Sequence, residues 1–457
     1  MGGFSLPGAE PERPPPRRTR GRAVTDPEHP LPVEPEVLSL FPESTRISDS
    51  GHLVIAGVDL VDVASTFGTP AYVVDVEQFR AHASQLVEGL RERWPNSEVL
   101  FASKSFPAVA MYALAATSGL SIDVAGAGEI VMALEAGVDP ARLYFHGNAK
   151  TDAELRRALE AGVGTIIIDN LDEFERLRRL ATRRQRVMVR VIPGVEPETH
   201  PSQSTGGDQS KFGLPFDQAT DLIAKIEADP FLDLYGVHLH IGSQVLRVEP
   251  FAEAIRNIAR LGDFPAYNIG GGLGVRYTYA EAPPSIDTYL DSIVKTAQAV
   301  LPAGAKLLIE PGRSLVARAG ISVYSVVSVK HTGRTFVAVD GGMADNMDPA
   351  LTGQRYEATI VTKVATPPNV LCHVVGRHCE SGDRIIDSIF LPNPAVDDLL
   401  AVPVAGAYSY TMANNYNGAL KPPVVLVDRG EMHLAVRRET FDDLLRTHRP
   451  EAAHHPA

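Results

Sequence analysis

Cysteine is nearly absent from this chain of 457 residues, since only Cys372 and Cys379 occur. Two cysteines are too few for a disulfide framework or a thiolate zinc site, so we expect a reducing, cytoplasmic setting. The sequence also lacks any apolar run of about 18 residues, the length of a membrane span. Basic clusters are missing beyond the N-terminus, and the formal net charge is −13. We therefore expect neither a membrane nor a nucleic-acid partner.

Lysine is also scarce, because only nine of the 43 basic residues are lysines. Lys104 nevertheless ends the apolar run VLFASK. Arginine keeps its proton in proteins, whereas a desolvated lysine can lose it and act as a nucleophile or form a Schiff base. The position indicates either a reactive amine or a lysine that extends from a strand end into solvent.

The two ends of the chain differ in composition from the rest. Residues 1–36 are rich in proline and arginine and lack the apolar segment of a secretory signal. We expect this segment to be a disordered tail, because it buries too little to offset the entropy of ordering. Residues 449–457 are expected to be frayed. Between the tails, 44% hydrophobic and 22% charged residues are typical of a globular enzyme.

Eight short apolar runs recur between residues 99 and 312, each followed by a small or polar residue and a helical pattern. They are VLFASK (99–104), SIDVAG (121–126), RLYFHG (142–147), TIIIDN (165–170), VMVRVIPG (187–194), YGVHLHIGS (235–243), YNIGGG (267–272) and LLIEPGR (307–313). Such near-continuous apolar strands are typical of a parallel sheet buried on both faces. The repeats predict an α/β fold, a (β/α)8 TIM-type barrel over residues 71–317. A doubly wound open sheet is the alternative.

The pattern of residue types changes after residue 318. Alternating apolar residues, β-branched residues and turn signals predict a C-terminal antiparallel β-domain over 318–448. Residues 37–70 are predicted to be an N-terminal strand segment that joins this β-domain.

Polar residues gather at the predicted C-terminal strand ends, where barrels of this kind carry their active sites. They are Lys104, Asp123, His146, Arg190, His240, Gly270, Gly271, Gly272 and Glu310. The glycines suit close approach to a phosphate, although glycines also form tight turns. Glu310 could pair with a pyridinium nitrogen or form a structural ion pair.

A lysine, a glycine cradle, a carboxylate and a ring that can stack are together what pyridoxal phosphate requires. The alternative is a metal-dependent barrel hydrolase that uses His238 and His240. That reading leaves Lys104 and the three glycines without a role, so we expect no resident metal ion.

From about Gly68 to Thr440 the chain resembles the fold-type III pyridoxal-phosphate decarboxylases, and among them the diaminopimelate decarboxylase family. The resemblance rests on ten motifs in the order of the family. They are FASKSFP, DVAGAGE, FHGNAK, STGGDQSKFG, GVHLHIGSQ, NIGGGLG, EPGR, DGGMADNMDPAL, HCESGD and GAYSYTMANNYNG. The resemblance implies a lyase that decarboxylates a small-molecule amino acid, as in lysine biosynthesis. Its cofactor would be pyridoxal 5'-phosphate.

The resemblance also implies individual roles. Lys104 would bind the cofactor covalently, His240 would stack on its ring, and Glu310 would keep the pyridine nitrogen protonated. The phosphate and the cofactor edge would be surrounded by Ser243, Gly271, Gly272, Gly312, Arg313 and Tyr408.

Because the active site of the family lies between two subunits, the resemblance implies a homodimer with shared sites. Cys379 of the partner subunit would protonate the product carbanion, and Glu380 of the partner subunit would face the distal amino group of the substrate. The other substrate contacts would be Arg313, Asp348, Thr352 and Tyr408.

The chain departs from the family at two positions. The family usually has an arginine before the proline of the DPAL segment and a tyrosine after it, and both hold the distal carboxylate of the substrate. Here these residues are Asp348 and Thr352. The substrate is therefore diaminopimelate, if Asp348 turns away, or an amino acid without the distal carboxylate, such as lysine, ornithine or a conjugated amino acid.

Other interpretations remain open at this stage. A racemase could share the barrel, but it needs a second base opposite the lysine. A non-catalytic pyridoxal-phosphate-binding protein would have no use for a cysteine loop. Asp123 and Arg190 could orient the barrel mouth or pair with each other. We expect Lys150 to be solvated at a helix start, and Cys372 to be a small buried hydrophobe.

Overall fold

The computed structural model describes residues 37–197, Gly206 and residues 210–449. The predicted tails therefore lie outside the described residues, except for Arg449, and so does part of the motif STGGDQSKFG. No helix in the described part of the chain combines the length and the apolar character needed to cross a membrane.

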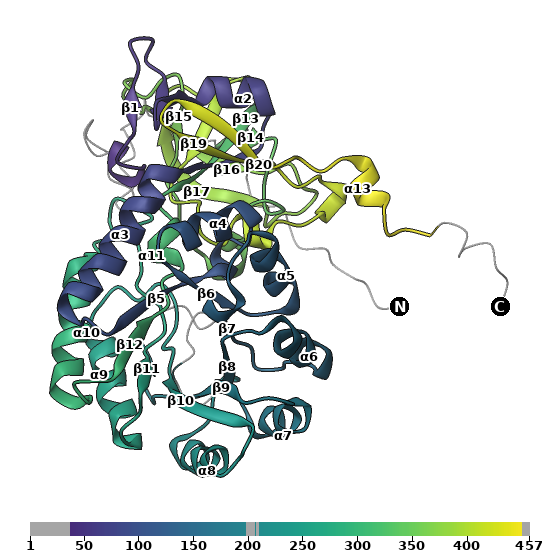
Figure 1. Cartoon of the computed structure of the whole chain (residues 1–457). Helices are drawn as coiled ribbons and strands as arrows, with labels where there is room; N and C mark the ends of the chain where they lie inside the picture. Colours follow the sequence, from purple (N-terminus) through teal and green to yellow (C-terminus); the bar gives the residue numbers. More distant parts are fainter. Residues whose placement is uncertain (1–36, 198–205, 207–209, 450–457) are drawn as a thin grey trace, which may run out of the picture. The chain divides into compact units, whose positions relative to one another are not determined.

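Eight parallel strands close into a barrel in the order β10-β11-β12-β5-β6-β7-β8-β9 (Figure 1). The strands are β5 (Ser97–Ala102), β6 (Ser121–Val124), β7 (Leu143–Phe145), β8 (Thr165–Ile168), β9 (Gln185–Arg190), β10 (Leu232–His238), β11 (Ala266–Asn268) and β12 (Lys306–Ile309). Each overlaps one of the eight predicted runs. The predicted (β/α)8 barrel is confirmed, and the open-sheet alternative is wrong.

Helices alternate with these strands, as the sequence patterns predicted. They are α3 (Val76–Arg93), α4 (Val109–Thr117), α5 (Ala127–Glu135), α6 (Asp152–Ala161), α7 (Leu171–Leu180), α8 (Phe216–Glu227), α9 (Glu249–Ile258), α10 (Ile286–Val300) and α11 (Arg313–Val316). The start of α6 shows why a helix forms there. The Thr151 hydroxyl accepts the Glu154 backbone N–H, and the Glu154 carboxylate accepts the Thr151 N–H, which together make a capping box.

The inside of the barrel is filled by a small apolar cluster with side chains from six strands. Its buried members are Leu100, Tyr144, Ile167, Met188, Ala266 and Leu308. Side chains along a strand alternate between its two faces, so residues two positions further on point the same way. The next inward-facing layer toward the C-terminal strand ends therefore contains polar groups, among them His146, Arg190 and Glu310.

The C-terminal domain is a nine-stranded sheet. Its strands are β4 (Ala71–Asp75), β13 (Gly320–His331), β14 (Thr335–Val339), β15 (Thr359–Ile360), β16 (Val370–Val375), β17 (Arg384–Leu391), β18 (Leu399–Val402), β19 (Val424–Asp428) and β20 (Glu431–Val436). Most pairs are antiparallel, as predicted, but β14 pairs with β16 and β4 pairs with β19 in parallel. The sheet is therefore mixed. Two short helices, α12 (Asp348–Thr352) and α13 (Phe441–Leu445), follow its strands.

The predicted start of the barrel at residue 71 is too early. β4 pairs with β13 and β19, so it is a central strand of the C-terminal sheet and enters the barrel domain only through α3. The segment before it folds as β1 (Arg46–Ile47), β2 (Leu53–Ile55), β3 (Val58–Asp59) and α2 (Leu60–Phe67). These strands form a separate three-stranded sheet. Leu53, Leu60 and Val63 pack with Val73 and Ile321, which covers one apolar face of the larger sheet.

Candidate active site

A cavity of about 310 Å³ opens at the C-terminal ends of the barrel strands. Its lining combines polar residues from six strand ends, and Gly272 after a seventh, with residues of the C-terminal domain. They are Ala102, Lys104, Asp123, His146, Arg190, Phe212, His238, His240, Ser243, Gly272, Glu310, Gly312, Arg313, Asp348, Leu351, Thr352, Tyr408 and Met412. The cavity thus brings together most of the predicted site residues from distant parts of the sequence.

Lys104 lies in η2 (Ser103–Ser105), a 3-10 helix of one turn directly after β5. Its side chain lines the cavity. The C-terminal domain holds this turn in place, because the Thr411 hydroxyl donates to the Lys104 carbonyl at 2.8 Å. Lys104 is exposed within one chain. Partial desolvation by itself lowers the pKa of its amine, but interactions with Tyr408 and Asp123 outweigh this effect and raise that pKa. Lys104 is therefore a cation in this structure.

Glu310 follows β12 and is buried on the floor of the cavity. Its Oε1 lies 2.9 Å from His146 Nε2 and accepts the Asn268 side-chain amide at 2.6 Å. Its Oε2 lies 3.1 Å from His238 Nε2. Burial acts to raise the pKa of Glu310, but the contacts with His146 and His238 hold it well below its usual range. The carboxylate therefore stays ionised at neutral pH.

The two histidines of the HLHIGS motif have different surroundings. His238 is fully buried beside Glu310, and burial lowers its pKa to about 4. His240 is half-buried, and its Nδ1 accepts the backbone N–H of Gly271 at 3.1 Å. Burial also lowers the pKa of His240 well below its usual value, so its ring is neutral at pH 7. Among the described residues, a group of three whose spacing could hold a metal ion is His146, His238 and Glu310. This group includes His238 but not His240, the second histidine of the alternative metal-hydrolase interpretation.

The glycines after β11 allow their backbone to lie in close contact with the backbone that follows β10 and β12. A Cβ at Gly271 would lie 2.1 Å from the Glu310 carbonyl oxygen, and one at Gly272 would lie 2.4 Å from the Gly242 carbonyl oxygen. A side chain is therefore excluded at both positions. Gly272 lines the cavity, whereas the N–H of Gly271 is already donated to His240.

Arg313 opens helix α11 and is buried at the far wall of the cavity. Its guanidinium donates to the Tyr277 hydroxyl and, at 3.2 Å, to the Ser243 hydroxyl. It also lies 4.8 Å from the centre of the Tyr408 ring. Tyr408 itself has a positive φ of 67°, a strained conformation for a tyrosine, and its N–H is donated to Ser105. The strain is typical of a residue held in place for function.

Cys379 and Glu380 do not line the cavity within one chain. Both are exposed, and the Cys379 N–H is donated to the Asn417 side chain at 2.9 Å. Cys372 is fully buried in β16, as predicted, and both cysteines are free thiols.

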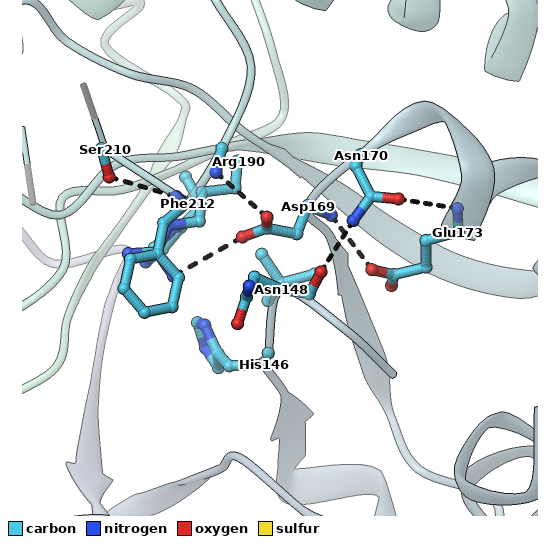
Figure 2. A network of polar contacts seen from close by, with 12 residues as sticks. His146, Asn148, Asp169, Asn170, Glu173, Arg190, Ser210 and Phe212 are labelled. Carbon is cyan, nitrogen blue, oxygen red and sulfur yellow. Dashed lines mark hydrogen bonds and ion pairs between the residues drawn. The ribbon is translucent and has the colours of Figure 1, made fainter. Parts of the chain in front are cut away.

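A polar network that includes the cavity-lining residues His146, Arg190 and Phe212 is shown in Figure 2. Arg190 pairs with Asp169 at 3.7 Å rather than with Asp123, which instead lies 3.7 Å from His146. Lys150 is not solvated, because its amine donates to the buried Glu173 carboxylate at 2.7 Å. These partners come from neighbouring strand ends and, for Glu173, from helix α7, so no local pattern in the sequence pairs them.

Lys150→Met is expected to lower the free energy of unfolding by about 3–5 kcal/mol, because it leaves Glu173 charged and buried without a cation. Urea unfolding followed by circular dichroism measures this loss. The matched double variant Lys150→Met with Glu173→Leu removes both charges and is expected to regain at least half of it. A single variant within about 1 kcal/mol of the wild type would show that the ion pair contributes little.

Phe212, Met412 and His146 also line the cavity, although no site role was predicted for them. His146 was visible as a polar residue at a strand end. Phe212 and Met412 carry no chemical signal in the sequence, since an apolar residue in a loop is usually packed rather than exposed to a ligand.

The fold and the cavity define a class of protein: a barrel enzyme with a lysine amine, a buried carboxylate and a glycine cradle at the strand ends. Residues 77–317 match the family model for the pyridoxal binding domain of pyridoxal-dependent decarboxylases. A diaminopimelate decarboxylase of Bacillus subtilis is 39% identical over 427 residues, covering 89% of this chain and 97% of that protein. One from Actinosynnema pretiosum is 41% identical over 421 residues, covering 89% and 94%.

Among solved structures, the diaminopimelate decarboxylase of M. jannaschii in complex with L-lysine superposes with a TM-score of 0.83 and 30% identity. The match covers 90% of this chain and 99% of that one. The chain belongs to the pyridoxal-dependent decarboxylases and, among them, to the diaminopimelate decarboxylase family.

Proposed function

We propose that this protein removes the α-carboxyl group of a diamino acid, with pyridoxal 5'-phosphate as its cofactor. The observation that carries the proposal is the convergence of Lys104, Glu310 and Arg313 on one cavity. When bound, the cofactor supplies an electron sink for the bond that breaks at the α-carbon.

The residues present fit this cofactor. Gly272 lines the cavity and has no side chain, so its backbone could approach a phosphate closely. Arg313 orients the Ser243 hydroxyl at the cavity wall, and Lys104 would supply an amine to hold the cofactor's aldehyde carbon. The ionised Glu310 would hold a proton on the pyridine nitrogen, and the neutral His240 ring would lie against the cofactor.

Release of carbon dioxide by the purified protein, with and without added pyridoxal phosphate, tests the proposal. The substrates are meso-diaminopimelate, both enantiomers of lysine and ornithine, arginine and glutamate. We expect release from at least one diamino acid, and only with the cofactor. If none of these substrates releases carbon dioxide, although the cofactor's visible absorbance shows that it is bound, the result would point to a conjugated substrate or a non-catalytic role.

We further propose a cytoplasmic homodimer with shared active sites. The support is that Cys379 and Glu380 are exposed and lie outside the cavity of their own chain, so a second copy is the natural source of these groups. In this arrangement Cys379 of the partner subunit donates the proton that replaces the carboxyl group. The two free thiols suit a reducing compartment.

Mixing two inactive variants tests the shared site. Lys104→Ala and Cys379→Ala are each expected to lose activity, but hybrid dimers contain one site with both native residues. Subunit exchange in an equal mixture is therefore expected to restore about a quarter of wild-type activity. Cys372→Ala, at the buried cysteine, is the control and is expected to stay active. Full activity of Cys379→Ala alone would contradict the proposal.

A further inference from the structure

We infer that the Asp348 carboxylate selects against substrates with a distal carboxylate, so the preferred substrate is an amino acid with a cationic or uncharged tail, such as lysine or ornithine. This inference rests on the proposed function. It deepens that function by naming the substrate class.

Asp348 does not turn away from the cavity. It begins α12, is only 2% exposed and is one of the cavity-lining residues. The Thr352 hydroxyl donates to Asp348 Oδ1 at 2.9 Å, and the Tyr356 hydroxyl donates to Oδ2 at 3.4 Å. Both oxygens therefore have partners that hold the carboxylate in its present orientation.

The Asp348 carboxylate also forms an ion pair with the Arg313 guanidinium. Asp348 Oδ2 lies 3.6 Å from Arg313 Nη1, and both side chains are buried. Burial by itself lowers the pKa of the Arg313 guanidinium, but Tyr277, Tyr408 and Asp348 raise it, so the group stays charged. A buried charge needs a partner, and the chain supplies that partner itself. The Arg313 charge is therefore already balanced before any substrate carboxylate arrives.

The remaining wall near α12 favours a tail without negative charge. Leu351 and Thr352 of α12 line the cavity there, and neither carries a positive charge. A second carboxylate in this place would find the Arg313 cation already paired and would lie beside the Asp348 carboxylate, which is unfavourable in a poorly solvated site. An ammonium or an uncharged group meets no such repulsion. In the dimer, Glu380 would add a second negative group at the distal end.

The inference is tested with the cofactor-loaded dimer by measuring kcat/KM for meso-diaminopimelate, L-lysine and L-ornithine. Wild type is expected to favour lysine or ornithine over diaminopimelate by at least about tenfold. Asp348→Asn removes the charge and keeps the shape, and Asp348→Arg with Thr352→Tyr introduces the residue types that the family usually has. Both are expected to shift the ratio toward diaminopimelate by at least about tenfold.

Asp221→Arg, on the exposed face of α8, changes the net charge away from the cavity and is expected to leave the ratio unchanged. Equal or better turnover of diaminopimelate by wild type overturns the inference, and so does an unchanged ratio in Asp348→Asn. Spectral titration of the bound cofactor also gives the Kd of each amino acid. If no amino acid loses carbon dioxide, the proposed function fails, and tighter wild-type binding of diaminopimelate than of lysine then separately overturns the inference.

Discussion

Lys104→Arg is expected to abolish the activity, lowering kcat/KM by at least about 10⁴-fold, because arginine keeps the positive charge beside Asp123 but has no amine that can hold the cofactor. The same variant is expected to lose the visible absorbance of covalently bound pyridoxal phosphate. Both quantities are measured on the purified protein after incubation with the cofactor.

Lys330→Arg, on the exposed end of β13, is the matched control and is expected to behave as wild type. Circular dichroism should show the same thermal unfolding for both variants, since the Lys104 side chain lines a cavity rather than filling a core. Retention of more than about a tenth of the wild-type activity by Lys104→Arg would exclude this lysine as the residue that holds the cofactor.

Glu310→Gln is expected to lower kcat by about 10²- to 10³-fold, because a neutral amide cannot stabilise a positive charge on the pyridine nitrogen. The amide keeps the size of the side chain and can still accept hydrogen bonds from Asn268. The loss therefore reports the charge rather than the packing. Because the pKa of Glu310 is held well below its usual range, the activity of wild type at mildly acidic pH is not expected to fall through this group.

Glu310→Asp keeps the carboxylate on a shorter side chain and is expected to recover part of the lost kcat. The visible spectrum of the bound cofactor supplies a second readout, since loss of the charge should change its absorbance even without substrate. A Glu310→Gln enzyme with kcat within about threefold of wild type would mean that the carboxylate serves only to hold His146 and His238.

The positions of the site residues along the chain were predictable for a local reason. Lys104, His240 and Glu310 each follow an apolar run directly, and parallel strands in a barrel bring their C-terminal ends together. Strand pleating then decides which of these side chains face inward, because the period of two continues from the apolar interior layer into the polar one.

The pairings among these residues were not predictable. Arg190 with Asp169, Lys150 with Glu173 and Asp348 with Arg313 join residues from 21 to 35 positions apart in the sequence. Each pair depends on which neighbouring loop supplies the opposite charge. The placement of β4 has the same cause, since a strand with five buried residues suits a barrel and a central sheet strand equally well.

By itself, the sequence determined the eightfold strand and helix pattern, the mixed chemistry of the strand ends and the membership of a decarboxylase family, because these depend on local periodicity and on residue type. Only the tertiary structure decided that Asp348 faces the cavity and balances Arg313, and that Cys379 lies outside the cavity of its own chain. Those features depend on contacts between distant segments, and a buried charge is oriented by whichever partner the fold brings within reach.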